Sequence, residues 1–469
     1  MEKYHYKALE VLKLQWWRQK DELKNHWNFC MYAVDNNWCY PSYGRTHYHK
    51  KSSKDTSSAL SNDAPFDLKI SFLMKIAGYP SLAACIIRDD QIIWSKGYGY
   101  YDLSERKPAT IETIYNIASI TKTIVGTALM QLYDQGLFGL DDDVNGFLPF
   151  SLRNPNFPDD PITFRMLLSH TSSLNENIQD QYWWINFSGD PPFDFFPEPY
   201  LREFLLPGGR YYDSSVWNTT YRPGEYAMYA NVGFDLISYL VEIISGESFL
   251  EYCDTHIFSP LDMKHTGFNL SCFDIDQVAI PYQRLDGKYY TIDEFFREES
   301  PPEKYWRVRF YPAGGLYSTV TDLSHFLIAH MNSGIYNGTR ILKKETVELM
   351  HELQPGNQLN YGLAWDHRPI RALPTASGHA GDFPGVDTWM LYMQTEDIGV
   401  IYLVNGNPYY SSLPPFLGWF LEIFILDSLF TKEGTLKGEM QHESTVSSVP
   451  SFMMPLIEPR RMSYGQKYN

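Results

Sequence analysis

The chain has 469 residues, of which 44% are hydrophobic and 16% aromatic, so it can bury a large core and is not a disordered protein over most of its length. Its formal net charge of −17 argues against nucleic-acid binding, because a phosphate backbone requires a basic surface. Length alone favours about three domains, but large α/β enzymes often form one compact unit.

The first part of the chain differs from the rest. Residues 1–63 form a leader that ends in a polar stretch, 50–58, with the composition of a linker, and no internal repeat is found along the chain. Residues 1–35 mix charged side chains with Trp and Tyr and lack the apolar region of a signal peptide. We therefore expect no export signal there and assign the chain by default to the cytoplasm.

Two apolar runs at the start of the folded part predict a β-hairpin. Residues 81–88 and 91–98 are rich in strand-forming side chains, and the acidic pair Asp89-Asp90 between them is a two-residue turn. From residue 119 to 135 the apolar spacing becomes helical, and Gly136 stands at the C-cap position.

The middle of the chain predicts helices and the end predicts strands. Residues 231–245 have a helical pattern, whereas 388–393 and 398–405 read as two strands joined by a short polar turn. Strands at both ends with helices between them favour an α/β fold, in which a helical subdomain at about 118–310 is inserted into one domain.

The predicted domain covers residues 64–430. Its last apolar stretch, 417–430, is interrupted by acidic side chains and too short to cross a bilayer, so it predicts a packed helix and no transmembrane segment. Residues 431–469 read as a polar tail.

The residue types that bind metals are scattered. The sequence contains neither a Cys-x-x-Cys pair nor a His-Glu-x-x-His segment, and His47 and His49 favour a solvated polar stretch over a ligand pair. We therefore predict no metal site, no organic cofactor and no disulfide framework. The five cysteines stand singly at Cys30, Cys39, Cys85, Cys253 and Cys272.

The segment Ser119-Ile120-Thr121-Lys122 carries candidate chemistry. At the start of a helix, residues i and i+3 share a face, so the ammonium of Lys122 can reach the hydroxyl of Ser119. The helix N-terminus favours an alkoxide there, and a lysine among apolar groups could accept a proton. The pattern is weak alone, because Ser104 and Lys107 have the same spacing in a charged segment that reads as surface.

Two further segments strengthen this interpretation. Tyr229-Ala230-Asn231 precedes the predicted helix at 231–245, and Gly378-His379-Ala380-Gly381 precedes the strand at 388–393. Each has a plain alternative, namely a core aromatic side chain for Tyr229 and a loop histidine bonded to the backbone for His379. The absence of a Gly-x-Ser-x-Gly segment disfavours an α/β-hydrolase.

Together and in this order, these segments resemble the serine β-lactamase and penicillin-binding-protein superfamily, especially its class C-like branch. The resemblance covers about residues 65–430. It includes, besides the three short motifs, residues 114–118, 162–174, 222–224, 260–268, 313–318 and 361–365.

The resemblance implies a β-lactamase-like α/β fold, with an antiparallel sheet flanked by helices and an inserted all-helical domain. It implies that Ser119 is the acylated nucleophile, that Lys122 activates it, and that Tyr229 shuttles a proton between nucleophile, leaving group and water. His170, in the segment His170-Thr171-Ser172-Ser173, is expected to be structural.

The resemblance also implies a set of substrate-binding residues. Asn231 would hold the substrate amide or the side chain of Lys122, and His379 and Gly381 would line the strand beside the cleft. The oxyanion hole would consist of the backbone N–H groups of Ser119 and Asp382.

The chain departs from the family at two positions. Class C β-lactamases carry Lys-Thr-Gly where this chain has His379-Ala380-Gly381, and a largely neutral histidine is a weaker partner for a substrate carboxylate. His-x-Gly is typical of related esterases and D-amino-acid peptidases. Ser173 replaces a family glycine, which affects backbone shape more than catalysis. The long segment 175–221 is rich in aromatic residues and predicts either a wall over the cleft or local packing.

We therefore expect a serine hydrolase that acts on a small-molecule ester or amide, β-lactam-like or a D-amino-acid peptide. The alternatives are a dedicated class C-like β-lactamase, a D-Ala-D-Ala-type peptidase, and an inactive binding or scaffold relative. The sequence makes no prediction of the oligomeric state.

Overall fold

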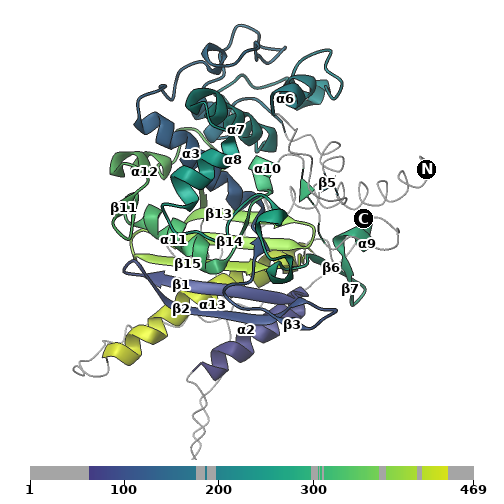
Figure 1. The fold of residues 1–469 in the computed structure, drawn as a ribbon, viewed down its shortest axis with the longest axis vertical. Coiled ribbons are helices and arrows are strands. Elements are labelled where there is room, and N and C mark those ends of the chain that lie inside the picture. The colour runs from purple at the N-terminus through teal and green to yellow at the C-terminus, as the bar shows by residue number, and fades with distance from the viewer. Residues whose placement is uncertain are drawn as a thin grey trace, which may run out of the picture.

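The computed structural model describes residues 63–175, 185–186, 197–296, 305, 307–308, 311–368, 376–408 and 415–441. A seven-stranded sheet with helices on both faces forms the body of this part (Figure 1). The predicted leader, apart from Asp63, and the end of the predicted tail lie outside the described residues, as does much of the aromatic segment after residue 175.

The sheet is antiparallel in every described pairing, as predicted, and its strand order is β12-β13-β14-β15-β1-β2-β3. Strand β1 pairs with β15, so strands from the two ends of the domain lie side by side in the middle of the sheet. The strands are β1 (Ser81–Arg88), β2 (Gln91–Asp102), β3 (Lys107–Pro108), β12 (Asp366–Arg368), β13 (Ala376–Phe383), β14 (Val386–Met393) and β15 (Ile398–Val404).

The predicted hairpin is confirmed as β1 and β2, which pair antiparallel. Its two turn residues, Asp89 and Asp90, have φ angles of 49° and 58°. Two successive left-handed residues form the turn that matches the twist of an antiparallel pair, and aspartate tolerates this conformation.

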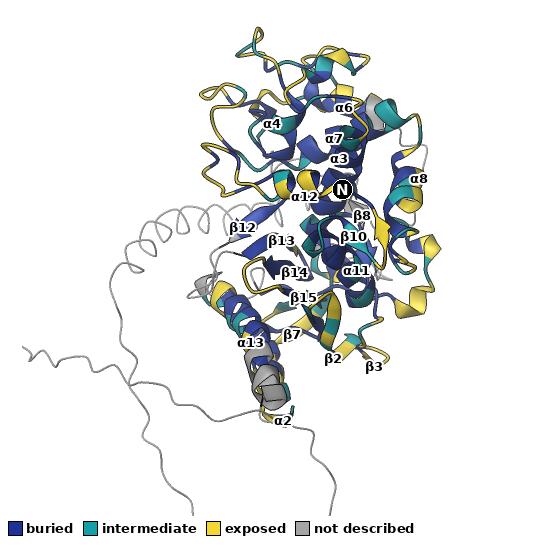
Figure 2. Cartoon of the chain, turned by 90° about the vertical axis from the view of Figure 1, so that its left-hand side faces the viewer, coloured by how far each residue is buried: buried dark blue, intermediate teal, exposed yellow. Residues whose placement is uncertain are grey.

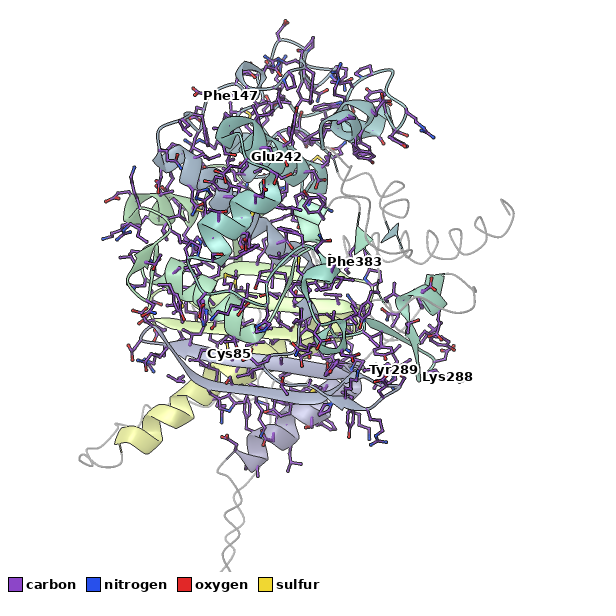
Figure 3. All side chains as sticks on the ribbon, viewed as in Figure 1. Cys85, Phe147, Glu242, Lys288, Tyr289 and Phe383 are labelled. Atoms are coloured by element: carbon purple, nitrogen blue, oxygen red, sulfur yellow. The ribbon has the colours of Figure 1, made fainter. Side chains whose placement is uncertain are left out.

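Side chains of β1 alternate between two cores, because successive strand residues point to opposite faces. Leu82, Ala84 and Ile86 pack with α2 (Ala64–Ala77) and α13 (Pro415–Gln441). Residues of the other face, Cys85 among them, join the larger core that includes α11 (Val320–Met331) and the helical part. Figure 1 shows α2 and α13 on the side of the sheet opposite α11, and Figure 3 labels Cys85 within the sheet.

The helical part contributes side chains to the larger core. Its longest helices are α3 (Thr121–Asp134) and α7 (Asn231–Ser245), which coincides with the prediction, and both are buried over most of their length (Figure 2). The α-helix after the predicted nucleophile begins at Thr121, because Ala118–Ile120 form one turn of 3-10 helix, η1. Phe147 and Glu242, labelled in Figure 3, lie in this part.

Shorter elements complete the described chain. The helices are α4 (Phe164–Leu168), α6 (Pro197–Leu205), α8 (Phe249–Cys253), α9 (Ile292–Phe296), α10 (Tyr311–Gly314) and α12 (Lys344–Met350), with single turns η2 (Val144–Gly146), η4 (Ser214–Val216), η5 (Asp254–Phe258), η6 (Leu270–Cys272) and η7 (Ile275–Gln277). The paired strands are β4 (Tyr115–Asn116) with β9 (Tyr317–Ser318), β5 (Ile185–Asn186) with β8 (Arg307–Val308), β6 (Tyr282–Leu285) with β7 (Lys288–Thr291), and β10 (Ile335–Tyr336) with β11 (Thr339–Arg340).

Helix α13 continues to Gln441, so the tail boundary drawn at residue 430 falls within it. The cause is visible at Lys432, whose ammonium lies 4.6 Å from the ring centre of Phe66 and 5.4 Å from that of Trp94 and pairs with Asp63. At this position, just beyond the predicted boundary, α2 and β2 supply partners for a charged side chain of the helix. No helix in the described ranges is long and apolar enough to cross a bilayer.

Candidate active site

Ser119 is the middle residue of η1 and is half-buried. The residue before it, Ala118, has a φ of 44°, a conformation that costs free energy for a residue with a side chain. Two bonds stabilise this turn: Ala118 N–H donates to Asn116 Oδ1 at 2.9 Å, and Thr121 Oγ1 donates to the Ala118 carbonyl at 2.6 Å. The surrounding chain therefore holds the predicted nucleophile in a strained, defined position.

Lys122 is fully buried and lies one turn after Ser119. Its ammonium donates to Ser119 Oγ at 3.0 Å, to Asn231 Oδ1 at 2.6 Å and to the Ala313 carbonyl at 2.6 Å. An ammonium has three protons, so these three acceptors match its donors. The contact with Ser119 agrees with the spacing argument, and Asn231 contacts Lys122, one of the two roles that the resemblance implied for it.

Two aromatic rings cover the Lys122 ammonium. It lies 4.9 Å from the ring centre of Tyr229 and 5.6 Å from that of Phe234 on α7. Attraction between a cation and a ring face offsets part of the cost of burying the charge. Tyr229 is half-buried, so the structure brings Ser119, Lys122 and Tyr229 together at the edge of the larger core.

The ring of His170 packs against the ring of Tyr229. The two rings lie 4.4 Å apart between centres, and His170 Nδ1 accepts the N–H of Ala230 at 3.1 Å. Burial, together with the charge of Lys122, holds the pKa of His170 well below its usual range. A neutral imidazole that accepts at Nδ1 carries its proton on Nε2, and this packing agrees with the structural role expected for His170.

Gly381 allows β13 to approach η1 closely. A Cβ added there would lie 2.3 Å from the Ile117 carbonyl oxygen and 2.2 Å from Thr388 Oγ1, distances that no real side chain tolerates. Thr388 Oγ1 itself donates to the Ile117 carbonyl at 2.9 Å and so ties β14 to the same turn. The N–H groups predicted for the oxyanion hole belong to the residues that follow Ala118 and Gly381, and that role stays a prediction.

His379 lies on β13, not in a loop. Its Nδ1 donates to the Ala380 carbonyl at 2.6 Å, and its Nε2 lies 2.7 Å from the hydroxyl of Tyr361. The ring is centred 6.4 Å from that of Tyr229. His379 therefore lies beside the catalytic candidates, but both of its nitrogens are bonded within the protein.

The carboxylate of Asp382 lies on the face of the sheet away from Ser119. Asp382 stands opposite Asp387 in the β13–β14 register, and opposite residues of an antiparallel pair share a face. Asp387 bonds to Tyr79 and Trp389, which belong to the core under α2 and α13, and Asp382 Oδ1 accepts from Asn407 Nδ2 at 2.6 Å. The Asp382 carboxylate is therefore directed away from Ser119.

The second serine–lysine pair forms no comparable site. Ser104 Oγ donates to Asp102 Oδ1 at 2.6 Å, whereas Lys107 pairs with Glu105 at 2.9 Å and Asp276 at 3.1 Å. The two side chains are therefore directed to different partners. Within the described ranges, no three His, Cys, Asp or Glu side chains are grouped so that they could hold a metal ion.

Several residues of the site could not be assigned from the sequence. The Ala313 carbonyl and the Tyr361 hydroxyl lie in segments of the resemblance, 313–318 and 361–365, but a segment match does not reveal which atoms face the site. Thr388 had no sequence signal. Ser173, at the position of the family glycine, has a φ of 60°, so the local backbone is left-handed without glycine.

The chain matches the Beta-lactamase family model over residues 66–414. Protein flp of Staphylococcus aureus (strain MW2) is 23% identical over 353 residues, which are 75% of this chain and 65% of that protein. The match thus spans slightly less than two thirds of the relative's length.

Two solved structures are similar over most of the described domain. The octameric penicillin-binding protein homologue from Pyrococcus abyssi has a TM-score of 0.59 at 25% identity and covers 79% of this chain and 78% of its own. The D-amino acid amidase from Ochrobactrum anthropi SV3 has a TM-score of 0.60 at 19% identity and covers 79% of this chain and 100% of its own, a likeness that shows the fold.

Proposed function

The chain belongs to the Beta-lactamase family, and on this premise we propose that it is a serine hydrolase that cleaves a small-molecule ester or amide through an acyl-enzyme on Ser119. One observation carries the proposal: the fully buried ammonium of Lys122 donates to Ser119 Oγ and lies against the ring of Tyr229. A nucleophile with a proton-transfer partner in hydrogen-bond contact is the arrangement that acyl transfer needs.

In the first step, Lys122 or Tyr229 has given one proton to solvent. Ser119 Oγ then bonds to the carbonyl carbon, the electron pair of the C=O bond moves to the oxygen, and the Ser119 proton passes to the deprotonated member of the pair. The tetrahedral intermediate then collapses, the bond to the leaving group breaks, and Tyr229 returns a proton to that group. In the second step, water attacks the acyl-enzyme and gives its proton to the same pair. The bond to Ser119 Oγ then breaks, the acid is released, and the pair returns a proton to Ser119 Oγ.

The substrate is an acyl compound whose binding does not require a fixed positive charge beside Ser119. A lysine at position 379 would offer a fixed charge to a penicillin carboxylate, but both nitrogens of His379 bond to protein atoms. This favours an ester or a simple amide over a dedicated β-lactamase or a D-Ala-D-Ala-type peptidase. The contacts of Lys122 with Ser119 and with Tyr229 favour an active enzyme over a scaffold relative.

The test is hydrolysis of p-nitrophenyl butyrate, a D-amino-acid p-nitroanilide and benzylpenicillin by the wild type, Ser119→Ala and the control Ser104→Ala. We expect the aryl ester to be cleaved more efficiently than benzylpenicillin, with a loss of several orders of magnitude in Ser119→Ala alone. A wide preference for the penicillin would identify a β-lactamase. Wild-type rates in Ser119→Ala, or no turnover of any substrate by the wild type, would contradict the proposal.

A further inference from the structure

Tyr361 and His379 form a buried pair beside the proposed catalytic residues. Each is 2% exposed, and the Tyr361 hydroxyl lies 2.7 Å from His379 Nε2. Tyr361 comes from the segment before β12, whereas His379 lies on β13. The ring of His170 lies edge-on to Tyr361 at 4.8 Å and packs on Tyr229 at 4.4 Å, which links the pair to the proton-transfer residues.

The bonds of His379 determine which nitrogen carries its proton. The Ala380 oxygen, 2.6 Å from Nδ1, is a carbonyl and can only accept, so Nδ1 is the donor. In the neutral ring Nε2 is then an acceptor, and the Tyr361 O–H donates to it. His379 is thereby held as the Nδ1–H tautomer with its remaining lone pair occupied.

Lys122 and His170, which both lie against the ring of Tyr229, also make hydrogen bonds within the protein. Lys122 directs its ammonium to Ser119, Asn231 and Ala313. His170, whose charged form is opposed by burial and by Lys122, accepts the Ala230 N–H. Tyr229, the remaining group, is a phenol. None of these bonds offers a nitrogen cation to a substrate carboxylate.

We propose that Tyr361 is a specificity-determining positioning residue, whose hydroxyl occupies His379 Nε2 and thereby makes the cleft favour acyl groups that lack a carboxylate. This inference rests on the proposed hydrolase function and adds a substrate class to it. Without the hydroxyl, Nε2 loses the partner that occupies its lone pair. When protonated, a form that acidic pH favours, His379 can then donate a charge-assisted hydrogen bond from Nε2 to a carboxylate.

The test compares two esters that differ only in a carboxylate: p-nitrophenyl butyrate and mono-p-nitrophenyl succinate. Tyr361→Phe removes the hydroxyl and retains the ring against His170. We expect the ratio of kcat/KM for succinate to that for butyrate to rise about tenfold in Tyr361→Phe at about pH 5.5, through a lower KM for the succinate, and to stay at the wild-type value at about pH 8.

Two controls separate this effect from a structural one. Tyr252→Phe removes another buried tyrosine hydroxyl, on α8, and should leave the ratio unchanged at both pH values. Adding His379→Gln to Tyr361→Phe should abolish the gain at low pH. An unchanged ratio in Tyr361→Phe, or a gain that survives His379→Gln, would overturn the inference while leaving the hydrolase function standing.

A second readout does not depend on turnover. ¹⁵N NMR of histidine-labelled protein, with the His379 signals assigned by their loss in His379→Gln, should show the Nδ1–H tautomer in the wild type and an altered Nε2 signal in Tyr361→Phe. An Nε2–H tautomer in the wild type would overturn the inference even if neither ester is hydrolysed, a result that would separately contradict the proposed function.

Discussion

At Lys122, a buried charge is matched by acceptors on three separate segments of the chain. Ser119 precedes it by one turn, Asn231 begins α7, and Ala313 belongs to α10. Burying an ammonium without such partners would cost several kcal/mol, because its hydration is lost. The same bonds place its positive charge 3.0 Å from Ser119 Oγ, where it would favour the alkoxide form of the proposed nucleophile.

Replacement of Lys122 by alanine should therefore remove most activity. We expect kcat/KM to fall by about a hundredfold to ten-thousandfold, the contribution typical of a proton-transfer group, while the fold is retained because the desolvation cost of the ammonium is removed with it. Lys107→Ala is the matched control and should retain wild-type turnover, since its partners Glu105 and Asp276 are on the surface. Kinetics and circular dichroism of both variants check this, and equal losses would contradict the assignment.

The close approach of β13 to η1 is set by Gly381. An alanine side chain would meet the Ile117 carbonyl, a backbone atom that cannot turn aside. We expect Gly381→Ala to push β13 away from Ser119 and lower kcat/KM by at least about tenfold, because misplacement by about 1 Å is costly in acyl transfer. Gly146→Ala, where an added Cβ has no neighbour within 4 Å, is the control. Wild-type kinetics in Gly381→Ala would show that this strand does not position the reaction.

Helix α13 is fixed to α2 and β2 by Lys432. Its side chain is 6% exposed, and the bond to its ammonium lowers the pKa of Asp63. Lys432→Ala should lower the free energy of unfolding by about 1–2 kcal/mol, discounted for the partial exposure of Asp63. Thermal unfolding measures the loss, with Lys344→Ala as a control at an exposed helical pair. An unchanged melting temperature would mean that the two rings and Asp63 do not hold the helix.

The sign of the Asp63 contribution follows from its lowered pKa. The Asp63 carboxylate binds a proton less readily in the native protein than in the unfolded chain. Its contribution to the free energy of unfolding is therefore present above the pKa of the unfolded chain and is lost as the pH falls through the native pKa. In Lys432→Ala this acid-dependent part of the stability should decrease, because Lys432 is the largest of the groups that lower the pKa of Asp63.

Local elements were the most predictable part of the fold. The β1–β2 hairpin and α7 follow from short-range signals, a two-residue acidic turn and an apolar helical spacing. The end of α13 did not follow, because Lys432 is stabilised by residues far away in the chain, Phe66 and Trp94. Polarity along the sequence cannot reveal such partners.

The same distinction applies to the candidate site. The Ser119–Lys122 contact lies within one turn and was predicted from spacing, whereas Tyr229 and His379 were assigned only through the order of family segments. The Ala313 carbonyl and the Tyr361–His379 bond depend on how those segments pack, and a backbone carbonyl can be supplied by any residue type.

Across the whole molecule, buried groups with shifted pKa values determine the pH range of stability. Burial raises the pKa of Asp387 to about 8, so the native state holds a proton that the unfolded chain has released. Its stabilising contribution is complete below the unfolded pKa and is lost as the pH rises through about 8. Burial lowers the pKa of His330 to about 3, and that contribution is present above the unfolded value of 6.5 and lost as the pH falls below it.

Asp387→Asn should reduce the loss of the free energy of unfolding as the pH rises, because asparagine resembles the neutral acid and does not titrate. From about pH 5 to 8 the wild type should lose up to about 1.4 kcal/mol per pH unit relative to the variant. Urea unfolding at a series of pH values measures the difference. Parallel stability curves for the two proteins would show that Asp387 is ionised in the native state throughout.

The central claim is that Ser119 becomes covalently acylated. The most direct measurement is mass spectrometry of protein quenched in acid during turnover of a p-nitrophenyl ester, or after treatment with a fluorophosphonate, followed by proteolysis and mapping of the adduct. The account predicts one added acyl or phosphonyl group on Ser119 in the wild type and in Ser104→Ala, and none in Ser119→Ala. An adduct on another residue, or undiminished labelling of Ser119→Ala, would contradict it.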